Sequence, residues 1–181
     1  GQFKLLDASS NAIQTDAYLQ TFEMSWVLKQ KPEIAIPLLR TIFDRITTSL
    51  EDNHRQGPRL IILEEAWLYV SHPLFVRQLK DWLKTCRKKN ARVVFATQSL
   101  ADLYDPSNKG LTETTATILE SCPTKIFLPH PSMDAEIKTL YQKIGLTERQ
   151  LEIIMHSIPK QHYYLTSPEG HRLIDLNLER L

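Results

Sequence analysis

The stretch "RLIILEEAW", residues 59–67, decides the fold because an unbroken aliphatic run ends in two adjacent carboxylates, Glu64 and Glu65. An aliphatic run that does not alternate with polar residues is typical of a strand buried on both faces, as in the centre of a parallel sheet. Residues just beyond the carboxyl end of such a strand face the ligand crevice of an α/β domain. The stretch therefore predicts a central parallel strand that presents two acids to a functional site.

Strand-like and helix-like segments alternate along the rest of the chain. Segments rich in β-branched and aromatic residues predict further strands at residues 19–24, 92–98 and 125–128. Apolar residues at three- and four-residue steps predict helices at residues 33–50, 74–89 and 111–120. Pro37 is expected in the first turn of the first helix, where its missing N–H is harmless. The alternation indicates an α/β fold with a mostly parallel sheet flanked by helices.

Two local signals mark the last part of the chain. Thr147 and Gln150 have the spacing of a capping box, which predicts that a helix starts there. The segment 161–176 predicts a β-hairpin that turns at Pro168, Glu169 and Gly170. We expect residues 1–181 to form a single domain that closes on this hairpin.

Composition excludes several classes of protein. The 22 basic and 21 acidic residues nearly balance, so a surface for polyanions must be local rather than global. The two cysteines and six histidines have no metal-ligand spacing, which argues against a zinc site or a disulfide framework. No apolar run approaches the roughly 20 residues that span a bilayer. We therefore expect no direct membrane insertion, and any membrane association would be through partners.

The paired acids suit the hydrolysis of a nucleoside triphosphate. In such a site Glu64 would hold Mg²⁺, directly or through water, and Glu65 would orient or deprotonate the attacking water. The pattern is short, and two solvated acids at the start of a helix would also be stabilised by the helix dipole. The acids alone leave both interpretations open.

Gln98 follows the predicted strand at residues 92–98 and supplies a second signal. A neutral amide at a strand end can contact both a γ-phosphate oxygen and the nucleophilic water. The same residue could instead cap the following helix. Together with the acids, Gln98 favours an ATPase.

The segment 77–92 is the most basic of the chain. It contains one acid, Asp81, and seven basic residues: Arg77, Lys80, Lys84, Arg87, Lys88, Lys89 and Arg92. Arg87 is the best candidate for a finger that reaches a neighbouring subunit's nucleotide, because guanidinium binds phosphate oxygens through two parallel hydrogen bonds. Contact of the lysines with a DNA backbone and a merely solvated helix face are the alternatives.

A family resemblance rests on five blocks in the same order along the chain. They are "QTFEM" (20–24), "LIILEEAW" (60–67), "WLKTCRKKNARVVFATQSLADL" (82–103), "ESCPTKIFLPHP" (120–131) and "YYLTSPEGHRLIDL" (163–176). The blocks resemble the C-terminal ATPase domain of type IV secretion and conjugative-transfer ATPases, the TrbE/CagE/VirB class. The resemblance covers nearly the whole chain.

This resemblance implies a RecA-like P-loop NTPase fold and a motor, usually hexameric, that uses ATP and Mg²⁺. Such motors work with other secretion components at the cytoplasmic face of the bacterial inner membrane, where they power pilus assembly or substrate transfer. By position, Glu64 and Glu65 match the Walker B acids, although the family usually has aspartate at the first position. Gln98 matches the sensor glutamine, Arg87 the arginine of the basic motif, and Arg172 a further arginine near the nucleotide.

The glycine loop that cradles phosphates is absent from the sequence. None of the five glycines begins a G-x-x-x-x-G-K-[ST] motif. In the family this loop lies upstream, so we expect the chain to be the second half of a motor domain. The loop-bearing strand would lie between those at 92–98 and 125–128, and its absence should leave a gap, let the two strands close, or admit another chain.

On this view the isolated chain neither binds ATP tightly nor hydrolyses it. A catalytically silent module that docks on transfer-machinery partners, or a nucleic-acid binder that uses the basic helix, are the alternative functions.

Overall fold

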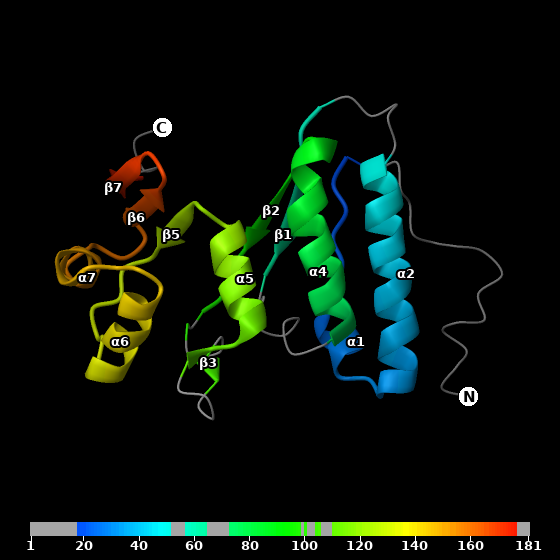
Figure 1. Ribbon diagram of the computed structural model, residues 1–181, viewed down its shortest axis with the longest axis horizontal. Coiled ribbons are helices and arrows are strands. Elements are labelled where there is room, and N and C mark those ends of the chain that lie inside the picture. Colours follow the sequence, from blue (N-terminus) through cyan, green and yellow to red (C-terminus); the bar gives the residue numbers. More distant parts are fainter. Residues whose placement is uncertain are drawn as a thin grey trace. The chain divides into compact units, whose positions relative to one another are not determined.

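The computed structural model describes residues 18–51, 57–64, 73–98, 100, 104–105 and 110–176 (Figure 1). The chain divides into two compact units, Gly1–Ala96 and Thr97–Leu181. The first contains a parallel strand pair with its helices, and the second contains an antiparallel sheet and a short hairpin.

The parallel pair β1 (Arg59–Leu63) and β2 (Ala91–Phe95) forms the centre of the first unit. Its register runs from Arg59 opposite Ala91 to Leu63 opposite Phe95. Backbone hydrogen bonds extend the pairing at both ends: Arg59 N–H donates to Asn90 O at 2.9 Å and Ala96 N–H donates to Leu63 O at 3.0 Å. Because the strands are parallel, their carboxyl ends lie at the same end of the pair, which we call its carboxyl edge.

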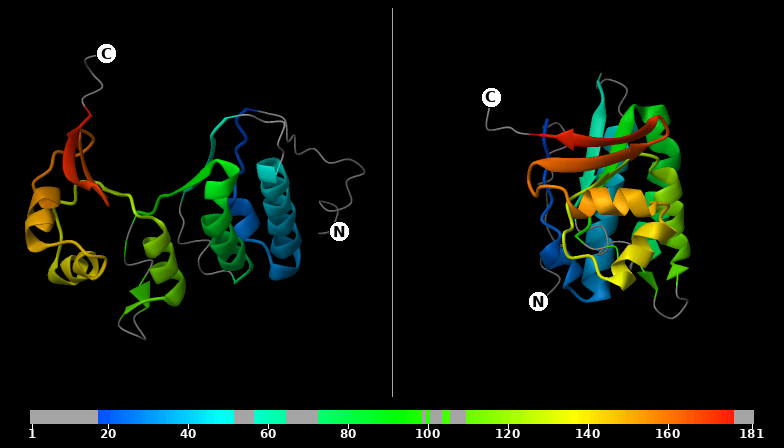
Figure 2. Two further views of the ribbon diagram at one scale, coloured as in Figure 1. Left: turned by 45° about the horizontal axis from the view of Figure 1, so that its top comes forward. Right: turned by 90° about the vertical axis from the view of Figure 1, so that its left-hand side faces the viewer.

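Two helices, α2 (Pro32–Glu51) and α4 (Pro73–Thr85), run side by side over this pair (Figures 1 and 2). A short helix, α1 (Ser25–Leu28), precedes α2, and the 3₁₀ turn η2 (Cys86–Lys89) follows α4. The predicted helices are thus confirmed, except that the second ends in η2. Pro32 takes the first helical position, whereas Pro37 lies inside α2, so its predicted place in the first turn is wrong.

Aromatic rings join α2 to α4. Phe43 on α2 makes edge contacts with Phe75, at 4.9 Å between ring centroids, and with Trp82, at 5.6 Å. Phe75 and Trp82 on α4 are almost fully buried, as is Leu39 on α2. Edge-to-face aromatic pairs add stability beyond the area they bury. This cluster therefore fixes how the two helices pack together.

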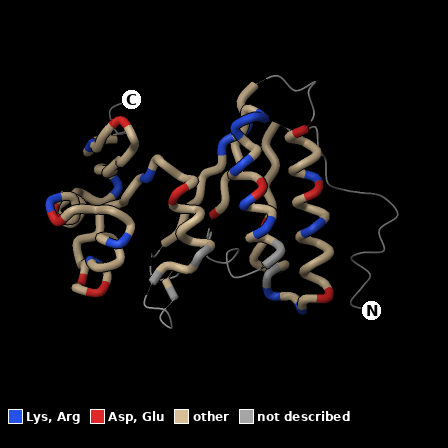
Figure 3. The backbone as a smooth tube through the Cα atoms, in the orientation of Figure 1, with Lys and Arg blue, Asp and Glu red and all other residues tan. Residues whose placement is uncertain are grey.

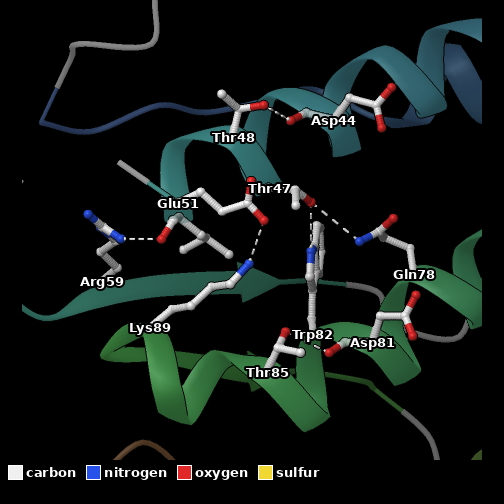
Figure 4. A network of polar contacts seen from close by, with 11 residues as sticks. Asp44, Thr47, Thr48, Glu51, Arg59, Gln78, Asp81, Trp82, Thr85 and Lys89 are labelled. Atoms are coloured by element: carbon white, nitrogen blue, oxygen red, sulfur yellow. Dashed lines mark hydrogen bonds and ion pairs between the residues drawn. The ribbon is translucent and has the colours of Figure 1, made fainter. Parts of the chain in front are cut away.

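A threonine satisfies the polar end of the tryptophan (Figure 4). Thr47 Oγ1 accepts hydrogen bonds from Trp82 Nε1 at 3.1 Å and from Gln78 Nε2 at 3.3 Å. A buried indole N–H without a partner would cost the free energy of its desolvation. Thr47 thus allows a tryptophan, rather than a purely apolar ring, to fill this core.

Two sequence-based predictions fail in the first unit. No strand forms at residues 19–24: residues 20–24 are irregular, and Ser25 N–H donates to the Glu23 carboxylate at 2.9 Å where α1 begins. Strand propensity depends on packing partners, and a local turn prevails here. Burial of β1 on both faces is also wrong for the described chain, because Leu60 and Ile62 are each 59% exposed. The helices cover only the face of Ile61 and Leu63.

The second unit is built on strands β5 (Lys125–Phe127), β6 (His162–Ser167) and β7 (Gly170–Asp175), antiparallel and in that order. Helices α6 (Ala135–Lys143) and α7 (Glu148–Met155) precede β6. The unit also holds β3 (Tyr104–Asp105), β4 (Gly110–Leu111) and α5 (Glu113–Ser121). The predicted hairpin is confirmed, and so is the Thr147–Gln150 capping box at the start of α7.

The core of this unit lies between one face of the sheet and the two helices. Phe127 on β5 and Tyr164 on β6 pack with Leu151 and Ile154 of α7, both fully buried. Tyr141 of α6 lies 5.7 Å from Phe127, ring to ring, and burial raises the pKa of its hydroxyl. The opposite face carries Ile126, which is 60% exposed.

The described strands form three sheets rather than one. The α/β fold is confirmed, but the mostly parallel sheet is realised only by β1 and β2. The reason lies in the connection after β5: the helices α6 and α7 return the chain so that β6 pairs with β5 in the antiparallel sense. The described strands β2 and β5 belong to different sheets.

Replacing Thr47 with valine should lower the free energy of unfolding by about 1–3 kcal/mol, because it leaves the buried Trp82 indole N–H unpaired. Thermal or urea unfolding followed by tryptophan fluorescence measures the change. The control is Thr48→Val on the same helix, where the residue is exposed and its hydroxyl, within the described chain, donates to the Asp44 carbonyl. Equal effects of the two substitutions would contradict this role of Thr47.

Candidate active site

Glu64 is the first residue after β1 and is exposed. It lies at the carboxyl edge of the parallel pair, where the bond from Ala96 N–H to Leu63 O keeps the two chain exits together. A single exposed carboxylate suits Mg²⁺, which takes oxygen ligands and usually keeps several waters. Glu65, its predicted partner, lies outside the described residues.

Gln98 stands beyond the strand rather than in it. The strand predicted at residues 92–98 is Ala91–Phe95, so Gln98 follows its end by three residues and belongs to the second unit. The side chain is exposed and takes part in an interaction. Its role as a sensor of the γ-phosphate stays a prediction.

Arg87 lies at the amino end of the parallel strand pair, whereas Glu64 lies at its carboxyl end. It is part of η2, which leads directly into the amino end of β2 through Asn90, a residue with a left-handed backbone at φ 50°. Parallel strands of this length span about 16 Å at 3.3 Å per residue. The first unit therefore does not bring Arg87 and Glu64 of the same chain together.

The 3₁₀ turn η2 is anchored to the end of α2 (Figure 4). Lys89 Nζ lies 2.9 Å from the Glu51 carboxylate, and the Lys89 side chain is only 24% exposed. Arg59 donates to Leu50 O at 2.6 Å beside it. Lys89 therefore stabilises the turn, whereas one alternative interpretation of the sequence had this lysine contact a DNA backbone.

The basic charge gathers from the end of α4 through η2 into β2 (Figure 3). Arg87 and Lys88 are exposed on η2, as are Lys84 on α4 and Arg92 on β2. The fixed turn thus presents Arg87 and Lys88 to solvent on a short, ordered segment.

Arg172 lies on β7 of the second unit, opposite Leu165 of β6. Neighbouring residues of a strand point to opposite faces, and Phe127 and Tyr164 define the face toward α6 and α7. By this register Arg172 projects from the other face, whereas His171 projects toward the helices. One pocket, lined by Lys125, Thr166 and His171 among others, opens on the helix side. The pocket has no signature along the chain, because its lining depends on cross-strand register.

Other chemistries find little support among the described residues. No group of three or more His, Cys, Asp or Glu side chains there could hold a metal ion. Burial raises the pKa of the Cys86 and Cys122 thiols, which disfavours the reactive thiolate. Within the same parts of the chain, no helix is long and apolar enough to cross a bilayer. Glu64 thus stands as a single exposed carboxylate, and the sequence contains no glycine loop that would cradle the phosphates of a nucleotide.

Comparison with known proteins identifies the family. The family model for the TraG P-loop domain matches residues 2–166. The chain is 39% identical over 176 residues to "Conjugal transfer protein TrbE" of Rhizobium radiobacter and, over the same length, to a probable conjugal transfer protein TrbE of Sinorhizobium fredii. It is 31% identical over 178 residues to "Type IV secretion system protein virB4" of Bartonella quintana. These alignments cover 96–97% of this chain but only 20–25% of the relatives.

The solved structure of VirB4 of Thermoanaerobacter pseudethanolicus shares the fold. It aligns with a TM-score of 0.58 at 17% identity and covers 77% of this chain and 37% of the VirB4 chain. At this identity the likeness shows a shared fold and no more. Together with the family match over residues 2–166, it shows that the chain belongs to the type IV secretion and conjugative-transfer ATPases, within the TraG P-loop domain.

Proposed function

We propose that these residues form the acid- and arginine-bearing part of an ATP-hydrolysing motor that energises type IV secretion or conjugative DNA transfer and pilus assembly. The observation that carries the proposal is the register of β1 and β2, which puts Glu64 at the carboxyl edge of a parallel pair. Ligands of open α/β sheets bind at that edge. The names of the relatives, conjugal transfer and type IV secretion proteins, support the biological setting.

In the proposed site each residue has one task. Glu64 holds Mg²⁺ through its exposed carboxylate, directly or through water. Glu65, the next residue, orients the attacking water and accepts its proton. Gln98 positions the same water through its amide. Mg²⁺, when bound, neutralises charge that develops on the phosphates.

The phosphate cradle must then come from outside residues 1–181. The sequence has no glycine loop with a following lysine, and the backbone N–H groups and lysine of that loop are what hold the phosphates. We therefore propose that the chain alone neither binds ATP tightly nor hydrolyses it. A further strand that bears the loop would pair with the edge of β2 that faces away from β1.

Arg87 acts on the nucleotide of a neighbouring subunit. Its place at the edge opposite Glu64 supports action between subunits rather than within one. The anchoring of η2 by Lys89 and Glu51 lowers the entropy cost of holding the guanidinium in one place. The proposal therefore includes a homo-oligomer, a hexamer by family resemblance, held at the cytoplasmic face of the inner membrane by other transfer components. Arg172 serves as a further contact near the nucleotide.

The exposed side chains of Arg87 and Lys88 favour one alternative, a module that binds nucleic acid. A basic surface of that kind loses affinity steeply with salt. Binding of a single-stranded oligonucleotide that weakens in Lys84→Ala and Lys88→Ala but not in a surface control would favour the alternative. The motor proposal expects no binding that depends on these lysines.

In a longer chain that carries the upstream glycine–lysine loop, Glu65→Gln should reduce ATP turnover by about 10²- to 10⁴-fold, the contribution of a positioned base. ATP binding should change little, because the amide keeps the shape of the side chain. Phosphate release measures turnover, and a fluorescent ATP analogue measures binding and confirms folding. Glu120→Gln, at an exposed position on α5, is the control. Normal turnover in Glu65→Gln would refute the assignment.

A mixture of two inactive variants tests Arg87. Arg87→Ala and Glu65→Gln should each lower turnover by about 10²-fold or more, while mixed oligomers should regain part of it, because some interfaces then combine an intact arginine with an intact acid. Steady-state ATP hydrolysis against mixing ratio is the measurement. Lys88→Ala should remain active throughout. Absence of recovery in mixtures that demonstrably co-assemble would rule out action between subunits.

A further inference from the structure

A small pocket in the second unit is not used by the proposed ATPase site. It has a volume of about 270 Å³ and lies between the helix-facing side of the sheet and the connection from α6 to α7. Ligand pockets usually measure about 300–1,000 Å³. The pocket therefore suits a small molecule or a single side chain rather than a nucleotide.

Strand register gathers polar side chains at one end of this pocket. Lys125, Thr166 and His171 stand directly opposite one another on β5, β6 and β7. Their row lies two residues from Phe127 and Tyr164, so all five share the helix-facing side of the sheet. Residues distant in sequence thus meet in a single row.

Most of the remaining lining is apolar. Phe127 and Leu146 are buried, and Ile144, Pro123 and Pro168 line the pocket beside them. Ser167 adds one polar side chain, whose hydroxyl donates to the Glu169 carboxylate. Gly145, with φ 98°, turns the chain after α6, and Leu146 N–H then donates to Tyr141 O at 3.1 Å. This turn brings both neighbours of the glycine, Ile144 and Leu146, to the pocket.

The donors of the pocket are only partly used. Thr166 is 9% exposed, and among the described residues no hydrogen bond reaches its hydroxyl. Lys125 Nζ donates one hydrogen bond, to Cys122 O at 3.1 Å, which leaves two of its three N–H groups. A buried hydroxyl without a partner costs free energy that a ligand could recover.

The one charged side chain of the lining is basic. Lys125 lines the pocket, and no Asp or Glu does. The nearest acid along the chain is Glu169 in the hairpin turn, which accepts from the Ser167 hydroxyl at 3.2 Å and does not line the pocket. The pocket thus combines a cationic, donor-rich end with an apolar floor.

We propose that this pocket binds the carboxylate of a small ligand that carries an apolar body. The carboxylate accepts from Lys125 Nζ and the Thr166 hydroxyl, and the apolar body lies against Phe127 and Leu146. Arg172 projects from the opposite face of the sheet, so the site is separate from that predicted nucleotide contact. The ligand is either a free small acid or the C-terminal residue of a partner chain that ends in an apolar residue.

The test is a titration of the isotope-labelled 181-residue chain, followed by chemical shifts of the Ile144 and Leu146 methyl groups. Benzoate represents a free acid, and N-acetyl-leucine represents a C-terminal residue. Their neutral counterparts are benzamide and N-acetyl-leucinamide. We expect saturable binding of at least one acid, about tenfold or more tighter than its amide, since a charged hydrogen bond contributes about 1.5–3 kcal/mol.

Variants connect the binding to the pocket. Lys125→Met and Thr166→Val should each weaken binding of the acid about tenfold, whereas Lys138→Met on α6 should not change it. Unchanged resonances of α7, which carries none of these substitutions, show that the variants are folded, and His171→Gln at the exposed rim provides a variant that leaves the core intact. Tighter binding of N-acetyl-leucine than of benzoate would identify a chain terminus, and the reverse order a free acid. Equal affinity for acid and amide, or binding insensitive to Lys125, would overturn the proposal.

Discussion

The parallel pairing of β1 with β2 is the interaction on which the account of the first unit depends. Its register fixes which residues leave the sheet at the carboxyl edge, and the bond from Ala96 N–H to Leu63 O keeps those exits together. The same register sends η2 to the opposite edge. A single set of backbone hydrogen bonds thus holds the predicted metal ligand Glu64 and the predicted finger Arg87 at opposite ends of the strand pair. Under the proposed function the two residues then act on different nucleotides.

Each unit leaves apolar side chains exposed on a sheet face. Ile62 and Val94 stand opposite each other on β1 and β2, and both are exposed, as is Ile126 on β5. Burying an aliphatic side chain contributes about 1.5–3 kcal/mol, so aligned exposed residues favour a covering partner. Under the proposed function the remainder of the motor domain supplies that cover, in agreement with relatives of which this chain spans a quarter or less.

The sequence predicted best what short-range physics decides. The α2 periodicity, the Thr147–Gln150 capping box and the hairpin turn each depend on residues that are only a few positions apart. The structure confirms all three. The strand expected at residues 19–24 failed because strand formation needs a partner that a propensity cannot supply. The two-sided burial of β1 failed because only one face receives helices from the described chain.

The candidate site was predictable only to a degree. Residue types and order indicated Glu64 and Arg87, but not that a parallel register would hold them at opposite edges. The capture of Lys89 by Glu51, distant in sequence, and the row that joins Lys125 to Thr166 both arise from tertiary pairing. The pattern of residues along a chain does not show which distant residues come into contact. The strand register of the folded structure does.

The most direct test of the central claim is the structure of a longer chain that carries the upstream glycine–lysine loop, bound to Mg²⁺ and a non-hydrolysable ATP analogue. We predict that the loop-bearing strand pairs with the edge of β2 that faces away from β1 and that the metal lies within one water of Glu64. A β2 strand whose second edge pairs directly with β5, or a metal remote from Glu64, would contradict it.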